Sequence, residues 1–197
     1  MKPAFFAGLD LGQAQDHSAL AIIERKLLFT PHRDPVTYQY ISTPTFDLRH
    51  IERIPLGVDY TAVAERVAQL RDVPGLHELK LAVDATGVGK PVVDFLRTKM
   101  GYANLVPVVI TAGHHAHSDN GTWYVPKKDL VTACTLTIER AQFRYSADLL
   151  HCHEFESELA NLREFPSSSG HVRYGPAGDG HDDLFMAFAL ALWRAHR

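Results

Sequence analysis

Three apolar segments of the chain each carry aspartate at or near one end. Asp10 lies within FFAGLDLG, Asp84 follows LKLAV, and Asp182 and Asp183 precede LFMAFALALW. An ionised carboxylate in an apolar core is costly unless it is paired or binds a cation. The fold therefore has to bring these aspartates to the ends of buried elements, where their charge can be compensated.

The order of apolar segments predicts an α/β domain with one mixed sheet. Apolar and β-branched runs predict strands at Phe5–Leu11, Ser18–Glu24, Val36–Ser42, Leu79–Val83 and Leu105–Ile110. Helices are predicted at Tyr60–Leu70, from residues 87–91 to Met100, and at Pro126–Arg140, Leu149–Phe165 and Asp183–Ala195. Short strands are predicted at Trp123–Val125 and His171–Tyr174, and residues 112–122 predict a loop. We expect five main strands, first three antiparallel and then parallel crossovers, with helices on both faces.

Size and charge limit the classes of protein to which the chain can belong. Its 197 residues suggest one domain, and 46% hydrophobic residues are enough for a core without disulfides. The formal net charge of −3 excludes a globally basic nucleic-acid-binding protein, so any such binding must use local patches. No apolar run approaches the roughly 20 residues of a membrane span, which predicts a cytoplasmic protein without membrane contacts.

Each aspartate by itself has an ordinary structural interpretation. Asp10 and Asp84 could cap turns, and either Asp182 or Asp183 could be the N-cap of the last helix. Together, however, three or four converging carboxylates repel one another unless a divalent cation neutralises them. All-oxygen ligands favour Mg²⁺ or Mn²⁺. Two such ions about 4 Å apart would activate a water and stabilise the leaving oxygen of a phosphodiester.

Four further residues are candidates for supporting roles. Asp16 follows Asp10 in the first hairpin and is a turn residue or an outer ligand, while His181 orients a carboxylate or simply begins a helix. Lys127 and Lys128 stand at a helix start, where they oppose the helix dipole. A nearby DNA phosphate would compensate for this unfavourable arrangement. The alternative, of equal weight, is that both lysines are solvated surface residues.

These motifs together resemble the nuclease domain of phage terminase large subunits, a member of the RNase H-like nucleases. The resemblance rests on GLDLGQAQDHSALAII, LAVDATGVGKPVVDFLR, WYVPKKDLV and GHDDLFMAFALALW, which occur in this order and span nearly the whole chain. It implies an RNase H-like fold and metal-dependent endonucleolytic cleavage of double-stranded DNA during genome packaging, in the host cytoplasm. An ATPase motor, a small terminase subunit and a portal are the implied partners.

The resemblance implies that the metal ligands and catalytic residues are Asp10, Asp84, Asp183 and Asp182, because these positions match the motifs of the family. Asp183 ranks before Asp182, because the last acidic ligand of RNase H-like proteins typically lies directly before the apolar helix. Asp16 is implied to support the metals.

The chain departs from a whole terminase large subunit in its lack of an ATPase motif. No G-x-x-x-x-G-K-[ST] phosphate loop occurs, since Asp84 and Pro91 stand where that motif needs Gly and Ser/Thr. Residues 1–197 are therefore expected to form a single nuclease domain without an ATPase domain.

Three alternative functions stay open at this point. The GLDLG hairpin also resembles the phosphate-binding hairpin of actin-like and sugar-kinase-like ATP-binding domains. A Holliday-junction resolvase is a rival within the nuclease class. A non-catalytic packaging or DNA-binding module would retain the fold without cleavage.

Overall fold

A computed structural model describes residues 4–12, 16–87, 90–166, 172–178 and 180–197. Its main sheet consists of β1 (Ala4–Asp10), β2 (Ser18–Arg33), β3 (Tyr40–Ile54), β4 (Lys80–Asp84), β5 (Leu105–Thr111), β6 (His117–Asp119), β7 (Thr122–Pro126) and β8 (Phe143–Tyr145). Its eight described strands lie in the order β6-β7-β5-β4-β1-β2-β3-β8. The strands nearest the middle of this order are those that carry Asp10 and Asp84.

The centre of the sheet confirms the predicted mixed topology. β1 pairs antiparallel with β2, which pairs antiparallel with β3, whereas β1, β4 and β5 are parallel neighbours. The expected count of five strands is too low, however. β7, predicted as a short strand, extends one side, where β6 pairs with it inside the predicted loop 112–122. On the other side β8 adds a parallel strand to β3.

The third predicted strand, Val36–Ser42, is largely misplaced. Val36 and Thr37 donate their backbone N–H groups to the side chain of Asp34 in a turn, and β3 runs on to Ile54. The second half of β3 is rich in charged residues, so its sequence lacks the apolar pattern that predicts a strand. In the fold those charges are paired with side chains of β2 and of the helices.

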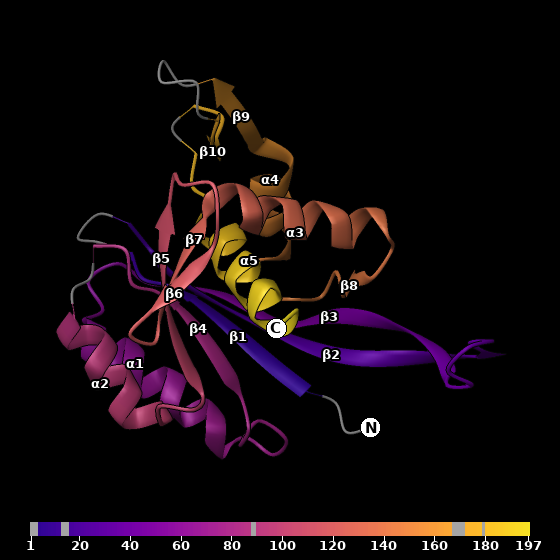
Figure 1. Cartoon of the computed structure of the whole chain (residues 1–197). Helices are drawn as coiled ribbons and strands as arrows, with labels where there is room; N and C mark the ends of the chain where they lie inside the picture. Colours follow the sequence, from indigo (N-terminus) through magenta and orange to yellow (C-terminus); the bar gives the residue numbers. More distant parts are fainter. Residues whose placement is uncertain (1–3, 13–15, 88–89, 167–171, 179) are drawn as a thin grey trace.

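Helices cover both faces of the sheet, as predicted (Figure 1). They are α1 (Tyr60–Gln69), followed by the 3₁₀ turn η1 (Leu70–Asp72), α2 (Lys90–Met100), α3 (Lys127–Glu139), α4 (Cys152–Asn161) and α5 (Asp183–Ala195). α1 and α2 pack on one face, and α5 lies on the other with α3 and α4 around it. None of the described helices is both long and apolar enough to cross a membrane.

The predicted helix Leu149–Phe165 is too long at both ends. α4 ends at Asn161, and Leu162 adopts an extended conformation that begins β9 (Leu162–Pro166). β9 pairs antiparallel with β10 (Val172–Pro176) in a separate two-stranded sheet. The strand predicted at His171–Tyr174 corresponds to β10, and His171 itself lies outside the described residues.

The nearly all-apolar sequence of α5 follows from its position between two layers. It packs against β1 and β2 on one side and against α3 and α4 on the other. A helix enclosed in this way needs apolar residues around its whole circumference. All its residues except Arg194 are buried, so α5 is the centre of the larger hydrophobic core.

Gly8 in the middle of β1 is where α5 comes closest to the sheet. A Cβ atom at this position would collide with the backbone atoms Ala187 O and Ala191 N, and with the side chain of Leu190. The contact therefore needs glycine for its lack of a side chain rather than for an unusual backbone angle. It sets the height and the register of α5 above β1.

We predict that Gly8→Ala lowers the free energy of unfolding by about 3 kcal/mol or more, because backbone collisions are harder to relieve than ordinary overpacking. Urea denaturation measures the change. Gly175→Ala in β10 is the control, since its added Cβ would meet nothing within 4 Å, and it should change stability by less than about 0.5 kcal/mol. Equal effects of the two substitutions would contradict the close approach at Gly8.

Candidate metal centre

Asp10 and Asp84 are brought together by the pairing of parallel strands. Each is the last residue of its strand, and the β1–β4 register pairs Leu9 with Val83 immediately before them. Neighbouring parallel strands end at the same edge of a sheet, so the two carboxylates lie side by side. The charge of Asp84 is among the causes that raise the pKa of Asp10, which agrees with this close approach. Asp84 also accepts the backbone N–H of Thr86 at 2.7 Å, so the turn-capping interpretation holds for one of its oxygens.

Asp182 and Asp183 approach the same edge from the start of α5. Asp182 occupies the N-cap position, but its side chain makes no capping hydrogen bond. It accepts instead from the ammonium group of Lys127 at 2.7 Å. Asp183 is buried in the first turn and accepts from Arg53 Nε at 2.7 Å. Neither carboxylate acts as a simple helix cap.

The four aspartates act on one another electrostatically. Burial raises the pKa of Asp10 well above its ordinary value, and the charges of Asp84, Asp182 and Asp183 raise it further. Burial also raises the pKa of Asp84. Lys127 opposes the shift at both positions. The predicted site residues are therefore gathered within electrostatic range of one another.

This donor set has the chemistry of a divalent-cation site. Its groups are carboxylate oxygens, which hard cations such as Mg²⁺ prefer. Among the described residues, no three carboxylate, imidazole or thiol groups already converge at metal-ligand distance. Lys127 makes an ion pair with Asp182, and Arg53 makes one with Asp183. A cation would supply the positive charge that these contacts now supply, so the residues fit such an ion.

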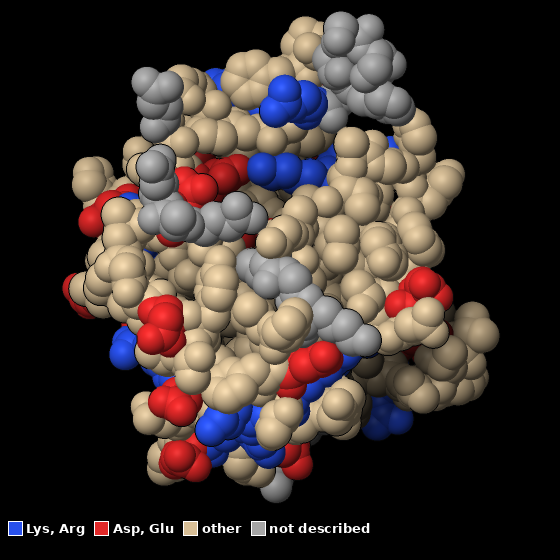
Figure 2. Space-filling view, turned by 90° about the vertical axis from the view of Figure 1, so that its left-hand side faces the viewer, with Lys and Arg blue, Asp and Glu red and all other residues tan. Residues whose placement is uncertain are grey.

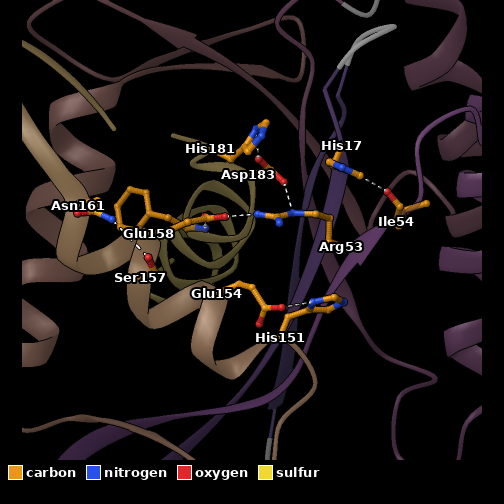
Figure 3. A network of polar contacts seen from close by, with 11 residues as sticks. His17, Arg53, Ile54, His151, Glu154, Ser157, Glu158, Asn161, His181 and Asp183 are labelled. Carbon is orange, nitrogen blue, oxygen red and sulfur yellow. Dashed lines mark hydrogen bonds and ion pairs between the residues drawn. The ribbon is translucent and has the colours of Figure 1, made fainter. Parts of the chain in front are cut away.

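The two supporting candidates have different surroundings. Asp16 is exposed and borders a hollow lined also by Gly12, Ser18 and Tyr60. His181 lies beside the acidic cluster, with Nδ1 3.7 Å from Asp183 Oδ1. Its ring stands edge-on to that of His17 (Figure 3). Of the two, His181 is the one in contact with a predicted ligand.

Lys127 and Lys128 both line a cleft of about 260 Å³ beside the acidic cluster. Lys127 also donates to Asp182 of the cluster. Arg173 and Tyr174 of β10 form part of the cleft wall. Figure 2 shows a face of the molecule on which acidic and basic side chains lie next to one another. A basic cleft thus borders the carboxylates.

Arg53 and Glu158 belong to the site but are not predicted from the sequence. Arg53 makes ion pairs with both Asp183 and Glu158, and Glu158 accepts the backbone N–H of Phe185 at 2.8 Å. Arg53 lies on β3 beyond the end of the predicted third strand, Val36–Ser42, so the sequence does not place it near the site. A charged residue aligned with the apolar row of β3 is the signal that could have found it.

The raised pKa of Asp10 predicts how the metal-free protein responds to pH. The folded state retains a proton that the unfolded chain releases above about pH 4, so stability should fall as pH rises from there. Asp10→Asn removes this proton linkage, and the variant should become more stable relative to the wild type as pH rises. Urea unfolding with a chelator, at several pH values, measures the difference. A difference that stays constant, or that shrinks with rising pH, would contradict the raised pKa.

The fold is similar to that of solved phage nucleases. No protein-family model matches the chain, and no curated protein matches its sequence. The large terminase nuclease of thermophilic phage G20c, solved with bound magnesium, has a TM-score of 0.65 and 22% identity, covering 98% of this chain and 82% of that one. The same nuclease with bound cobalt also has a TM-score of 0.65 and 22% identity, with 98% and 81% covered. The nuclease domain of Thermus phage P74-26 large terminase has a TM-score of 0.60 and 21% identity, with 96% and 78% covered. The chain therefore has the RNase H-like fold of the phage large terminase nuclease, as its sequence motifs predict.

Proposed function

We propose that this chain is a divalent-metal-dependent endonuclease that hydrolyses phosphodiester bonds of double-stranded DNA during phage genome packaging. The observation that carries the proposal is that the carboxylates of Asp10, Asp84, Asp182 and Asp183 lie at one edge of the sheet, where the other three act on Asp10 by their charges. Nucleases of the same fold, solved with magnesium and with cobalt, support it.

The proposed ligands differ in how they are held. Asp10 and Asp84 lie on rigid strand ends, and Asp183 on the first turn of a buried helix. Asp182 is half-buried and paired with Lys127. In this proposal it is either a second metal ligand beside Asp183 or a neighbour of that ligand. Two Mg²⁺ or Mn²⁺ ions bound here would activate a water and stabilise the leaving oxygen. His181, in contact with Asp183, orients that carboxylate or the attacking water.

The cleft beside the carboxylates suits a DNA backbone. Lys128 and Arg173 line it, and Lys127 stands between it and Asp182. Cationic side chains next to an acidic metal site hold phosphates while the carboxylates themselves would repel them. This proposal includes the partners that the resemblance implies, which are an ATPase motor, a small terminase and a portal. It also includes the host cytoplasm as the location of the protein.

We predict that Asp84→Ala abolishes metal-dependent cleavage, because it removes one of the two carboxylates fixed on strand ends. The assay incubates plasmid DNA with the protein and Mn²⁺ or Mg²⁺, and follows nicked and linear products. Asp72→Ala is the matched control, since Asp72 is an exposed carboxylate in η1, outside the cluster. Cleavage that survives Asp84→Ala would show this assignment of the site to be wrong, and a wild type that does not cut would refute the nuclease function.

A second prediction concerns Lys128. In an Asp84→Ala background, where cleavage is prevented, Lys128→Ala should weaken duplex binding and reduce the slope of log K against log salt by about 0.9, the value for one lost phosphate contact. Fluorescence anisotropy at several salt concentrations measures the slope. Lys99→Ala on α2, on the other face of the sheet, should leave it unchanged. Identical slopes for all three proteins would mean that Lys128 is a solvated surface residue.

A further inference from the structure

Arg53 lies in the same transverse row of the sheet as the strand-end aspartates. Asp10 on β1 is paired with Ala19 on β2, and Ala19 is paired with Arg53 on β3. Residues paired across a sheet project from the same face, which here is the face covered by α5. Ala19, fully buried and with no side chain beyond Cβ, leaves room above it. The long side chain of Arg53 therefore starts only two strands away from Asp10.

The guanidinium group of Arg53 bridges two carboxylates at the start of α5 (Figure 3). Nε donates to Asp183 Oδ2 at 2.7 Å, and the terminal nitrogen donates to Glu158 Oε1. Glu158 Oε2 accepts the backbone N–H of Phe185 at 2.8 Å. These contacts form a closed loop that begins and ends in the first turn of α5. The side chains of Arg53, Asp183 and Glu158 are only 19%, 8% and 7% exposed, so solvent competes little with the contacts.

The two carboxylate oxygens of Asp183 have different neighbours. Oδ2 is taken by Arg53, whereas Oδ1 lies on the side of His181, 3.7 Å from its Nδ1. A buried carboxylate with one oxygen fixed by a charge-assisted hydrogen bond has little freedom to rotate. Arg53 therefore occupies one oxygen of Asp183 and leaves Oδ1 outside its own contact.

We propose that Arg53 is a positioning residue for the metal centre, which holds Asp183 so that Oδ1 faces the cluster, and that Glu158 braces Arg53 from α4. This inference rests on the proposed nuclease function for its catalytic consequence. The planar fork of arginine can bridge two carboxylates at once, which the single nitrogen of lysine does less well. Arg53 itself touches neither substrate nor metal in this role.

The chain offers a matched control on the same strand. Arg49 of β3 also bridges two carboxylates, with Nε 2.7 Å from Glu24 Oε2 and a terminal nitrogen 3.1 Å from Asp47 Oδ2. This cluster contains none of the proposed ligands. Arg49→Gln and Arg53→Gln therefore remove the same kind of contact, and only the second removes it from a proposed ligand.

The test compares Mn²⁺ binding, by calorimetry and electron paramagnetic resonance, with DNA cleavage kinetics for the wild type and both variants. Arg53→Gln should lose about 10- to 100-fold in Mn²⁺ affinity and in kcat, the usual cost of removing a group that orients a metal ligand. The KM for DNA should stay within about twofold, because phosphate contacts are intact. Arg49→Gln should match the wild type in both measurements.

Arg53→Lys separates positioning from stability, and serves if Arg53→Gln does not fold. Lysine retains a positive charge between Asp183 and Glu158, so it should restore the melting temperature while Mn²⁺ affinity and kcat stay below those of the wild type. Recovery of all three in parallel would overturn the positioning role.

A crystal structure of the variant that folds makes the outcome independent of catalysis. We expect the Asp183 side chain to rotate away from the orientation it has with Arg53. An unchanged orientation would overturn the inference even if the wild type cleaves DNA. Conversely, a wild type that neither binds Mn²⁺ nor cleaves would refute the proposed nuclease, while this structure would still decide whether Arg53 orients Asp183.

Discussion

The close packing of α5 on β1 at Gly8 is the contact on which the rest of the structure depends. Ala187, directly above Gly8, lies one helical turn after Asp183, and Gly8 lies two residues before Asp10. The contact that buries the helix therefore also sets the distance between two carboxylates from opposite ends of the chain. Stability and site geometry are coupled here, since a helix held further from the sheet would move Asp183 away from Asp10.

Charge compensation is the second constraint, and it is divided between two cationic side chains. Lys127 pairs with Asp182, and Arg53 pairs with Asp183. Asp10 and Asp84 have raised pKa values because burial disfavours their charged forms. A site of this kind costs folding free energy when it holds no cation. Perturbed carboxylates gathered at one sheet edge are more typical of a functional site than of a structural one.

The sequence predicts most of the fold where the pattern of apolar residues reflects burial. The central strands, both helical layers and the bounds of α5 follow from such patterns. It fails where tertiary contacts compensate charge. β3 carries Asp47, Glu52 and Arg53 in buried or partly buried positions, each with an ionic partner on another element, and no local pattern indicates such a strand. β8 is not predicted because it depends on pairing with β3, which is distant in sequence. β6 pairs with the adjacent β7, but its three residues are polar and exposed, so no apolar pattern marks it.

Sequence by itself determined which residues could form a site, because aspartates at the ends of apolar segments need compensation wherever the chain folds. It also determined that Asp10 and Asp84 lie together, since the ends of neighbouring parallel strands lie at one edge of a sheet. Only the tertiary structure decided how each carboxylate is held: Asp84 by the backbone of Thr86, Asp182 by Lys127, and Asp183 by Arg53. The physical reason is that ion pairs join residues as far apart in sequence as Arg53 and Asp183, and packing alone brings such partners within reach.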